Sequence, residues 1–191
     1  MRVLRAADYR RMPWKNGGGV TTEIAVFPEG AGLDAFEWRL SMATVSSDGP
    51  FSLFPGVDRT LAVLEGEGIV LSVDGLPGET VARMSTPFAF PADRPASALL
   101  ISGPITDLNV MTKRRLWKHK VERLLPTQSN IVREAGATAI VFCARGSSAI
   151  SSRGKKATLD IHDAAVVDAA YCEIANSDGC ELYVVTLNKL A

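Results

Sequence analysis

Short runs in which apolar and polar residues alternate make up most of the chain. Alternation with a period of two, rich in β-branched residues, is typical of strands that bury one face. Turn-forming segments such as SSDGP, LFPG, DGLPGE and SGP separate the runs. The clearest predicted strand segments cover residues 37–45, 59–73, 97–103 and 105–112. This pattern predicts an all-β protein whose many short strands form a sandwich or a barrel.

A weak internal repeat relates the two parts of the chain. TLAVLEGEGIVLSVDG resembles TAIVFCARGSSAISSRG in its apolar spacing, and Gly68 and Gly146 lie 78 residues apart. ITDLNVMT likewise resembles GCELYVVT, with Asp107 and Glu181 at a spacing of 74 residues. Two copies of a β-unit of roughly 75 residues explain both the length and the number of strands.

Composition and charge exclude several classes of function. Of the 191 residues, 21 are Lys or Arg and 21 are Asp or Glu, so the net charge is zero. No overall field therefore favours nucleic acid or an anionic membrane as a partner. No run is fit for a signal peptide or a membrane span, and the three cysteines form no C-x-x-C pair. We expect a cytoplasmic protein with buried thiols.

A basic segment, KRRLWKHKVERLLP, lies between the two copies of the repeat. We interpret it as a connecting strand with one solvated face, because charged and less polar residues alternate along it. The charged residues are Lys118, Lys120 and Glu122, and the residues that alternate with them are Trp117, His119 and Val121. No motif for nucleic-acid binding accompanies it.

A glycine-rich loop, PWKNGGGVTTEI, covers residues 13–24. A phosphate-binding P-loop carries its lysine after the glycines and opens a helix, whereas Lys15 precedes them here and a β-branched run follows. The G-x-G-x-x-G spacing of dinucleotide sites is absent as well. What remains is a loop of unusual backbone freedom that carries Trp14, Lys15 and Asn16 side by side.

Polar residues concentrate in the first copy of the repeat. If its strands form one barrel, side chains from several of them could converge inside it, with the glycine-rich loop at its rim. The predicted ligand-binding residues are Trp14, Lys15, Asn16, Glu23, Arg39, Ser41, Asp58, Arg59 and Asn109. Arg39 could instead form a surface salt bridge, Arg59 could merely pair with Asp58 to brace the strand, and Asn16 could form an Asx-turn.

Metal and covalent chemistry have little support. His119 and His162 are the only histidines, and VDR stands where a metal-binding barrel would carry an H-x-H pair. No G-x-S-x-G elbow is present. We therefore expect no metal, no cofactor and no catalytic nucleophile. A pocket rich in arginine favours anion binding, because a guanidinium grips a carboxylate with two hydrogen bonds.

Three blocks together resemble the HutD/Ves family: PWKNGGGVTTEI, FEWRLSMATVSSDGPFSLFPGVDRTLAVLEGEG and SGPITDLNVMT, within residues 3–112. The resemblance implies a bicupin, with two jelly-roll or cupin β-barrel halves in one chain. The halves would be an N-terminal barrel with the pocket, residues 1–112, and a degenerate C-terminal barrel, residues 113–191. It also implies a link to histidine utilisation, in which a pathway intermediate is bound and pathway activity limited. The Ves branch is instead described as stress-induced.

Three functions follow as alternatives. The first is a non-enzymatic sensor of a small carboxylate such as urocanate, formylglutamate or formiminoglutamate. The second is a metal-independent isomerase or hydrolase acting on such a compound, with Glu23 or Asp58 as base. The third is a partner-binding protein that uses the basic segment as its interface. The sequence is compatible with a homodimer and does not fix the oligomeric state.

Overall fold

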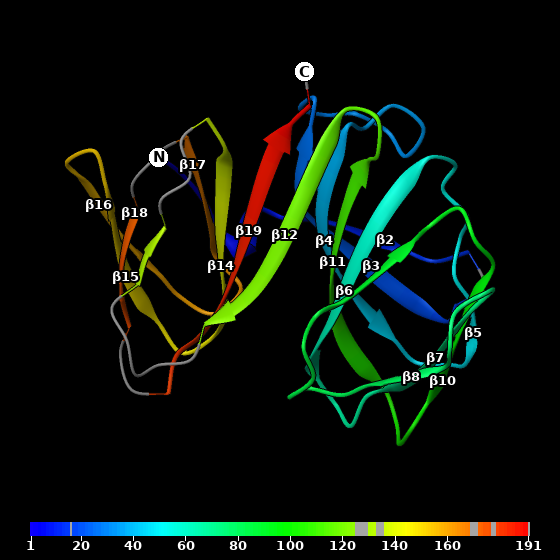
Figure 1. The fold of residues 1–191 in the computed structure, drawn as a ribbon. Helices are drawn as coiled ribbons and strands as arrows, with labels where there is room; N and C mark the ends of the chain where they lie inside the picture. Colours follow the sequence, from blue (N-terminus) through cyan, green and yellow to red (C-terminus); the bar gives the residue numbers. More distant parts are fainter. Residues whose placement is uncertain (16, 125–129, 133–135, 169–171, 177–178, 191) are drawn as a thin grey trace. The chain divides into compact units, whose positions relative to one another are not determined.

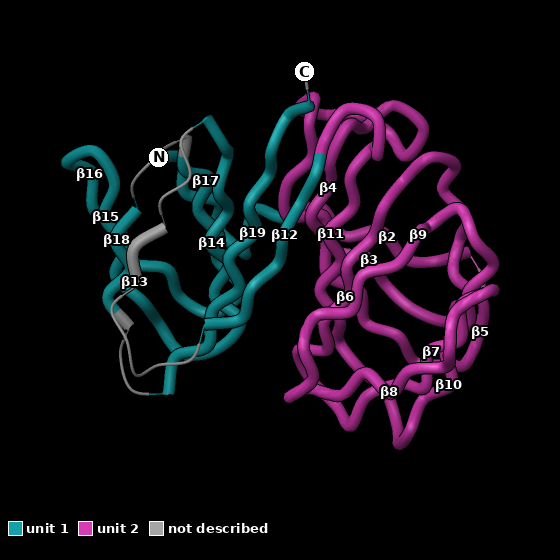
Figure 2. The backbone as a smooth tube through the Cα atoms, viewed as in Figure 1, with its two compact units in different colours: residues 1–9, 118–191 teal, residues 10–117 magenta. Residues whose placement is uncertain are grey.

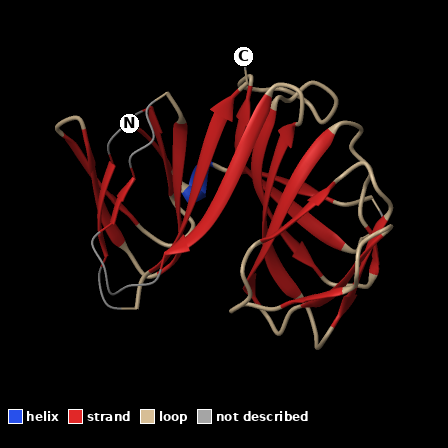
Figure 3. Ribbon diagram, in the orientation of Figure 1, coloured by secondary structure: helices blue, strands red, loops and turns tan. Residues whose placement is uncertain are grey.

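Antiparallel strands account for almost all of the secondary structure. The computed structural model describes residues 1–15, 17–124, 130–132, 136–168, 172–176 and 179–190. Within these ranges the helical structure is limited to a three-residue 3-10 turn, η1 (Ala6–Asp8) (Figures 1 and 3). The predicted all-β class is confirmed. No helix in the described residues is long and apolar enough to cross a membrane.

The chain divides into two compact units (Figure 2). The N-terminal unit comprises residues 10–117, and the C-terminal unit comprises residues 1–9 together with residues 118–191. The first nine residues thus belong to the C-terminal unit, because β1 (Arg2–Leu4) pairs with β17 (Ala164–Asp168). The expected halves at residues 1–112 and 113–191 remain a prediction about domains.

Two antiparallel sheets form the N-terminal unit (Figure 1). The six-stranded sheet has the order β2-β3-β4-β11-β6-β9 and the four-stranded sheet the order β5-β10-β7-β8. The strands of the first are β2 (Arg10–Pro13), β3 (Gly19–Phe27), β4 (Trp38–Val45), β11 (Ile105–Lys113), β6 (Val57–Glu65) and β9 (Phe88–Pro91). Those of the second are β5 (Gly49–Pro50), β10 (Ala96–Leu100), β7 (Ile69–Val73) and β8 (Glu79–Val81). Every strand predicted from alternation in this unit is present.

The described part of the C-terminal unit also consists of two sheets. Their orders are β1-β17-β14-β19-β12 and β13-β18-β15-β16. The strands not yet given are β12 (Trp117–Leu124), β13 (Asn130–Val132), β14 (Thr138–Arg145), β15 (Ser148–Ser152), β16 (Lys155–Leu159), β18 (Cys172–Asn176) and β19 (Glu181–Lys189). Exposure alternates along the first residues of β12, which confirms the prediction of a strand with one solvated face.

The internal repeat is visible in the sheet topology. Strands β9-β6-β11-β4 of the N-terminal unit occupy the same order as β17-β14-β19-β12 of the C-terminal unit. The smaller sheets match in the same way, with β5-β10-β7-β8 against β13-β18-β15-β16. Strands β1, β2 and β3 lie outside this correspondence. The two units are therefore two versions of one strand arrangement, with different additions at their sheet edges.

The second spacing of the repeat needs a correction. If Leu61 corresponds to Ala139, as the first spacing requires, the ladders align Asn109 with Thr186, a spacing of 77 residues. The predicted spacing of 74 instead aligns Asp107 with Glu181. Asp107 lies on the face of β11 that packs in the core, whereas Glu181 lies on the face of β19 away from the core residues Leu182 and Val184. The irregularities in pairing do not explain the difference, because the skipped residues, Leu64 of β6 and Ala144 of β14, lie in strands that correspond.

The expectation of two closed barrels is not confirmed. In the residues that the structure describes, no sheet pairs its first strand with its last, so each unit is a pair of open sheets. The strands of the four-stranded sheets are only two to five residues long, and the chain passes between sheets through turns that interrupt the ladders. Backbone pairing is therefore continuous within each sheet and not around the unit.

An aliphatic core lies between the two sheets of each unit. In the N-terminal unit it includes Leu61 and Val63 of β6 with Ile69 and Leu71 of β7, all at most 1% exposed. Strand β7 alternates buried and exposed residues, as the sequence pattern predicts. Burying such side chains supplies the main driving force for joining the sheets.

At position 68, in the connection from β6 to β7, glycine is required because the backbone of Val81 lies too close for a side chain. Its φ is +114°, and a Cβ atom there would lie 2.5 Å from the Val81 carbonyl oxygen. Gly103 also has a positive φ, of +65°, but a Cβ atom would meet nothing within 4 Å. We predict that Gly103→Ala lowers the unfolding free energy by about 1–2 kcal/mol, the cost of the left-handed backbone. Gly68→Ala should cost about 1–3 kcal/mol more, because the backbone must shift.

Chemical denaturation of the two variants and the wild type provides the measurement. Both changes add one methyl group at a positive φ, so the larger loss expected at Gly68 combines the close approach with its less favourable φ of +114°. Equal losses of stability would contradict the packing described for the turn between β6 and β7.

Candidate functional site

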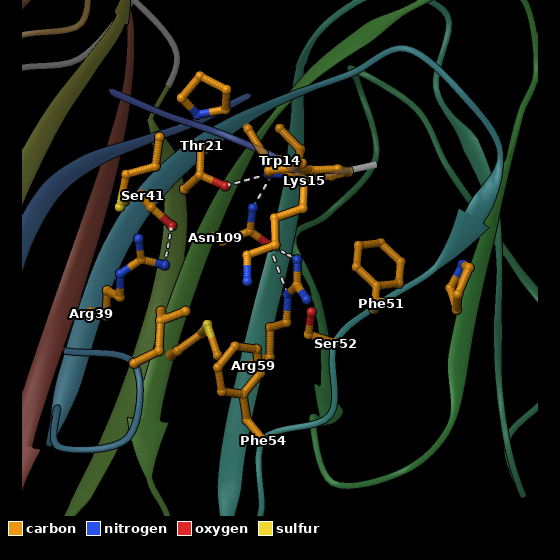
Figure 4. A pocket seen from close by; sticks show the side chains of 17 residues that line it. Trp14, Lys15, Thr21, Arg39, Ser41, Phe51, Ser52, Phe54, Arg59 and Asn109 are labelled. Atoms are coloured by element: carbon orange, nitrogen blue, oxygen red, sulfur yellow. Dashed lines mark hydrogen bonds between the residues drawn. The ribbon is translucent and has the colours of Figure 1, made fainter. Parts of the chain in front are cut away.

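A pocket of about 530 Å³ opens in the N-terminal unit (Figure 4). It lies at the polar end of the six-stranded sheet, on the face that continues into the aliphatic core. Its lining comprises Met12, Pro13, Trp14, Lys15, Thr21, Leu33, Arg39, Ser41, Ala43, Pro50, Phe51, Ser52, Phe54, Arg59, Asp107, Asn109 and Met111. A volume of this size suits a small molecule.

The strand register arranges the polar lining in rows across β4, β11 and β6. The first row, which we call the cationic row, is Arg39, Met111 and Arg59. The next row inward places Asn109 between Ser41 and Leu61, and the third places Asp107 between Ala43 and Val63. Because strand side chains repeat every two residues, all these side chains share one face. Polarity thus falls step by step from the cationic row to the core.

Arg59 is held by an amide and an aromatic ring. Both its Nε and its Nη2 donate hydrogen bonds to Asn109 Oδ1, with Nε at 2.7 Å. Its guanidinium carbon lies 4.3 Å from the centre of the Phe51 ring, a cation–π contact. Burial lowers the pKa of Arg59 to about 10, which the Asp107 carboxylate opposes. The guanidinium therefore stays charged at neutral pH.

Asp107 lies behind Asn109 as seen from Arg59. Its Oδ1 accepts a hydrogen bond from Asn109 Nδ2, so the amide bridges the carboxylate and the guanidinium. The residue is 1% exposed, and its Oδ2 is buried without a hydrogen-bond partner among the described residues. Burial raises the pKa of Asp107 to about 6, against the opposing effects of Arg59, of the Asn109 hydrogen bond and of the nearby Ala43 backbone N–H.

Arg39 has a carboxylate partner of its own. Its Nε lies 2.8 Å from Glu23 Oε2, and its Nη1 lies 3.5 Å from Ser41 Oγ. Arg39 is almost buried, whereas the Glu23 side chain is 17% exposed. Arg39 thus forms a salt bridge, but the pair is buried beside the pocket rather than at the surface, as the alternative had it.

The glycine-rich loop forms the rim. Trp14 Nε1 donates to Thr21 Oγ1 at 2.8 Å, and the Trp14 ring covers Gly19. A Cβ atom at Gly19 would lie 2.4 Å from the Thr44 carbonyl oxygen and 3.0 Å from the Trp14 ring, so only glycine fits. Lys15 extends from this rim toward the two arginines (Figure 4). The glycines thus allow the aromatic ring to pack on the strand beside the pocket.

Most of the predicted site residues come together here. Six of the nine line the pocket: Trp14, Lys15, Arg39, Ser41, Arg59 and Asn109. Glu23 lies one step behind the lining, through its bond to Arg39. Asn16 lies outside the described residues. Asp58 points elsewhere and pairs with Arg114 at 2.7 Å, with both side chains partly exposed, so its salt bridge is with Arg114 rather than with Arg59.

Sequence reasoning left out three residues that shape the site. Asp107 shares its strand face with Asn109 and Met111, a signal that the alternation already contained. Phe51 follows a turn and carries no periodic signal, because only the folded chain brings its ring against Arg59. Thr21 is positioned by the β2–β3 hairpin as the partner of Trp14.

The charges of the lining favour an anion. Three cations, Lys15, Arg39 and Arg59, face the cavity with one carboxyl group, Asp107. Even with Glu23 counted, the surroundings of the pocket keep an excess of positive charge. In the described residues, no group of three or more His, Cys, Asp or Glu side chains is placed to hold a metal ion. The arrangement can bind a small carboxylate through charge-assisted hydrogen bonds.

Comparison with known proteins identifies the family. The HutD family model matches residues 6–184. The chain belongs to the HutD family. A Pseudomonas putida relative, an uncharacterised 21.2 kDa protein in the hutC 3′ region, is 36% identical over 82% of this chain and 80% of its own. Protein Ves of Citrobacter koseri is 43% identical over 60% of each chain. The resemblance to the HutD/Ves family is thereby confirmed, and the family is linked to histidine utilisation.

Solved structures agree with this assignment. A conserved Pseudomonas aeruginosa protein of unknown function matches with a TM-score of 0.90 and 35% identity over 98% of each chain. HutD from Pseudomonas fluorescens matches with a TM-score of 0.83 and 34% identity over 100% of this chain and 99% of that one. A cupin barrel protein from Leptotrichia buccalis is only 10% identical, with a TM-score of 0.58 over 95% and 96% of the two chains. This last match shows a cupin-like fold alone.

Two arginine–carboxylate pairs of the N-terminal unit, Arg39–Glu23 and Arg114–Asp58, should differ in their contribution to stability. Glu23→Ala leaves the buried Arg39 without its carboxylate, which we expect to lower the unfolding free energy by about 3–5 kcal/mol. Asp58→Ala removes an exposed partner of Arg114, with both side chains more than 40% exposed, and should cost about 0–1 kcal/mol.

Urea unfolding of both variants tests this difference. Each variant loses one carboxylate from one arginine, but Arg114 keeps Asp93 as a second partner, so Asp58→Ala serves as the control for an exposed pair. A Glu23→Ala protein as stable as Asp58→Ala would show that the buried pair carries no such energy.

Proposed function

We propose that the HutD-family protein described here is a non-enzymatic receptor for a small carboxylate in histidine utilisation. In this proposal it senses a pathway intermediate, of the urocanate, formylglutamate or formiminoglutamate type, and thereby limits pathway activity. The N-terminal unit holds the ligand, and the C-terminal unit is a degenerate copy, so that the chain is a bicupin in which one half keeps the site. The observation that carries the proposal is the cationic row at the mouth of a polar pocket.

The geometry of the two arginines supports a carboxylate in particular. They flank Met111 in one row, so both guanidinium groups face the same small volume. Arg59 uses only Nε and Nη2 among the described residues, and both reach the same amide oxygen. Further donors of its planar fork are thus available to a second acceptor. Lys15 can add a third charge from the rim.

The relatives are consistent with this ligand class. The Pseudomonas fluorescens HutD structure is described as a formate condition, and formate is the smallest carboxylate. The Pseudomonas putida relative is described as a protein in the hutC 3′ region. A carboxylate receptor is therefore a reasonable role for a family linked to histidine breakdown.

One observation favours a second candidate, a metal-independent isomerase or hydrolase. Asp107 is a buried pocket carboxyl whose pKa of about 6 suits a general acid or base. The bases first considered suit the role less well, because Glu23 is bound to Arg39 and Asp58 lies outside the pocket lining. The receptor remains the preferred proposal, because the described lining holds no serine–histidine or cysteine–histidine pair that could form a covalent intermediate.

Arg59 should dominate the affinity. A charge-assisted hydrogen bond contributes about 1.5–3 kcal/mol, so Arg59→Ala should weaken binding of N-formyl-L-glutamate by roughly ten- to hundred-fold. Arg59→Lys keeps the charge but loses the planar fork, and should recover only part of the affinity. Calorimetric titration measures both, with unfolding curves to confirm that each variant folds.

Lys118→Ala is the control, because Lys118 is an exposed cation in the C-terminal unit. Its affinity should equal that of the wild type. Unchanged binding by a folded Arg59→Ala protein would place the ligand elsewhere and overturn the proposed site.

Turnover separates the two candidate functions. A receptor should return urocanate, N-formyl-L-glutamate and N-formimino-L-glutamate unchanged after prolonged incubation, as followed by mass spectrometry. Conversion of any of them at a rate that Asp107→Asn abolishes would instead establish the enzyme, with Asp107 as its acid or base.

A further inference from the structure

We propose that Asp107 takes up a proton when a carboxylate enters the pocket, and that its Oδ2 hydroxyl then donates a hydrogen bond to the bound anion. This inference rests on the proposed function, since it assigns a role at the same site. Asp107 would then be the one carboxyl group of the described pocket lining to contact the ligand, alongside the cations Lys15, Arg39 and Arg59. Affinity for the ligand then depends on pH through this one residue.

The position of Asp107 provides the first support. Its two cross-strand neighbours on the same face, Ala43 of β4 and Val63 of β6, are buried and apolar. Ile105, two residues before Asp107 on β11, belongs to the aliphatic core. Oδ2 has no hydrogen-bond partner among the described residues, although the residue lines the pocket. A carboxyl oxygen that is buried and unpaired calls for a partner. A ligand at the floor of the pocket can supply one.

The charges around Asp107 explain why a proton should accompany the anion. From β6, Arg59 reaches it through Asn109, and from β4, Arg39 faces the pocket while bound to Glu23 of β3. From the rim, Lys15 is the remaining cation of the described lining. A second negative charge in this desolvated space would repel an ionised Asp107. Protonation removes the repulsion and turns an acceptor into a donor.

Asn109 links the two events. Its oxygen accepts a hydrogen bond from Arg59 and its nitrogen donates one to Asp107, so the amide connects the cation with the carboxyl group. A carboxylate that binds to Arg59 competes with this contact and weakens the stabilisation of an ionised Asp107. Both effects act in the same direction, toward the protonated carboxyl.

The direction of the pH dependence follows from these contacts. Burial already raises the pKa of Asp107 to about 6 in the free protein, and a bound anion raises it further. Below the free pKa the proton is present in both states, so affinity should be constant. Between the free and the bound pKa, affinity should fall by up to about tenfold per pH unit as pH rises, because one proton must be taken up.

The unit offers a clean background for this measurement. Residues 10–117 contain no histidine and no cysteine, the side chains that ordinarily titrate between pH 6 and 9. Formate is a suitable probe, because it has a single carboxylate that remains ionised above pH 5. We expect calorimetric titration of the full chain with formate to show constant affinity at pH 5–6 and a progressive loss up to pH 8.5. Repetition in two buffers of different ionisation enthalpy should show proton uptake per formate bound.

Asp107→Asn is the decisive variant, because asparagine mimics the protonated carboxyl in shape and in hydrogen bonding. It should bind formate at pH 8 as tightly as the wild type does at pH 5, without proton uptake. Asp58→Asn, which changes an exposed carboxylate of the same unit, should keep the wild-type pH dependence.

A second readout needs no ligand. Because the folded-state pKa of Asp107 lies above its ordinary value of 3.8, the folded state binds the proton more tightly than the unfolded state. The unfolding free energy of the wild type, relative to Asp107→Asn, should therefore fall as pH rises from about 4 to about 6 and then level off.

The outcomes separate this inference from the proposed function. Formate binding by the wild type with the same affinity from pH 5 to 8.5, and without proton uptake, would overturn the role of Asp107 and leave the receptor intact. An Asp107→Asn variant that keeps the wild-type pH dependence would do the same. Absence of binding by both formate and N-formyl-L-glutamate at every pH would overturn both proposals.

Discussion

The bridge from Arg59 through Asn109 to Asp107 is the interaction on which the site depends. A buried guanidinium and a buried carboxyl are each costly alone, and one amide side chain satisfies both. This requires β6 and β11 to be neighbours in a fixed register, because a slip of one residue would turn Asn109 to the other face. The aliphatic core below and the Phe51 ring above hold that register and that guanidinium in place.

The same strand arrangement occurs twice, but the polar chemistry occurs in one unit. At the positions that the ladders align with Asp107 and Asn109, the C-terminal unit carries Val184 and Thr186, and Ala137 corresponds to Arg59. All three residues are buried, and Val184 belongs to an aliphatic cluster. The fold therefore tolerates either a polar or an apolar end between its sheets. The N-terminal unit uses this freedom for a pocket, with the extra strands β2 and β3 forming its rim.

Fixed charges give this site a character different from a metal centre. Arginine keeps its charge over the whole physiological range, so the proposed attraction of an anion by the cationic row does not depend on a bound metal ion. Its strength is moderated by the carboxylate of Glu23 on one side and by Asp107 on the other. Such a balance supports the proposed reversible binding of a small carboxylate.

Strand identity, the repeat and most polar members of the site could be read from the sequence, because period-two alternation assigns each side chain to a face before any pairing is known. Arg39, Ser41, Arg59 and Asn109 were predicted in this way, and the family followed from blocks in the same segments. The sequence did not show which groups pair with each charge. Asp58 is adjacent to Arg59 in the chain, yet it bonds Arg114, which follows the neighbouring strand β11. Asp107 is distant from Arg59 in the chain and is connected to it through Asn109. Whether the sheets close, and how the repeat aligns beyond its first strand, also depended on pairing between distant segments. Local sequence therefore determined which residues face inward, and only the register of the assembled sheets decided which of them meet, because hydrogen bonding across strands, not adjacency along the chain, sets those distances.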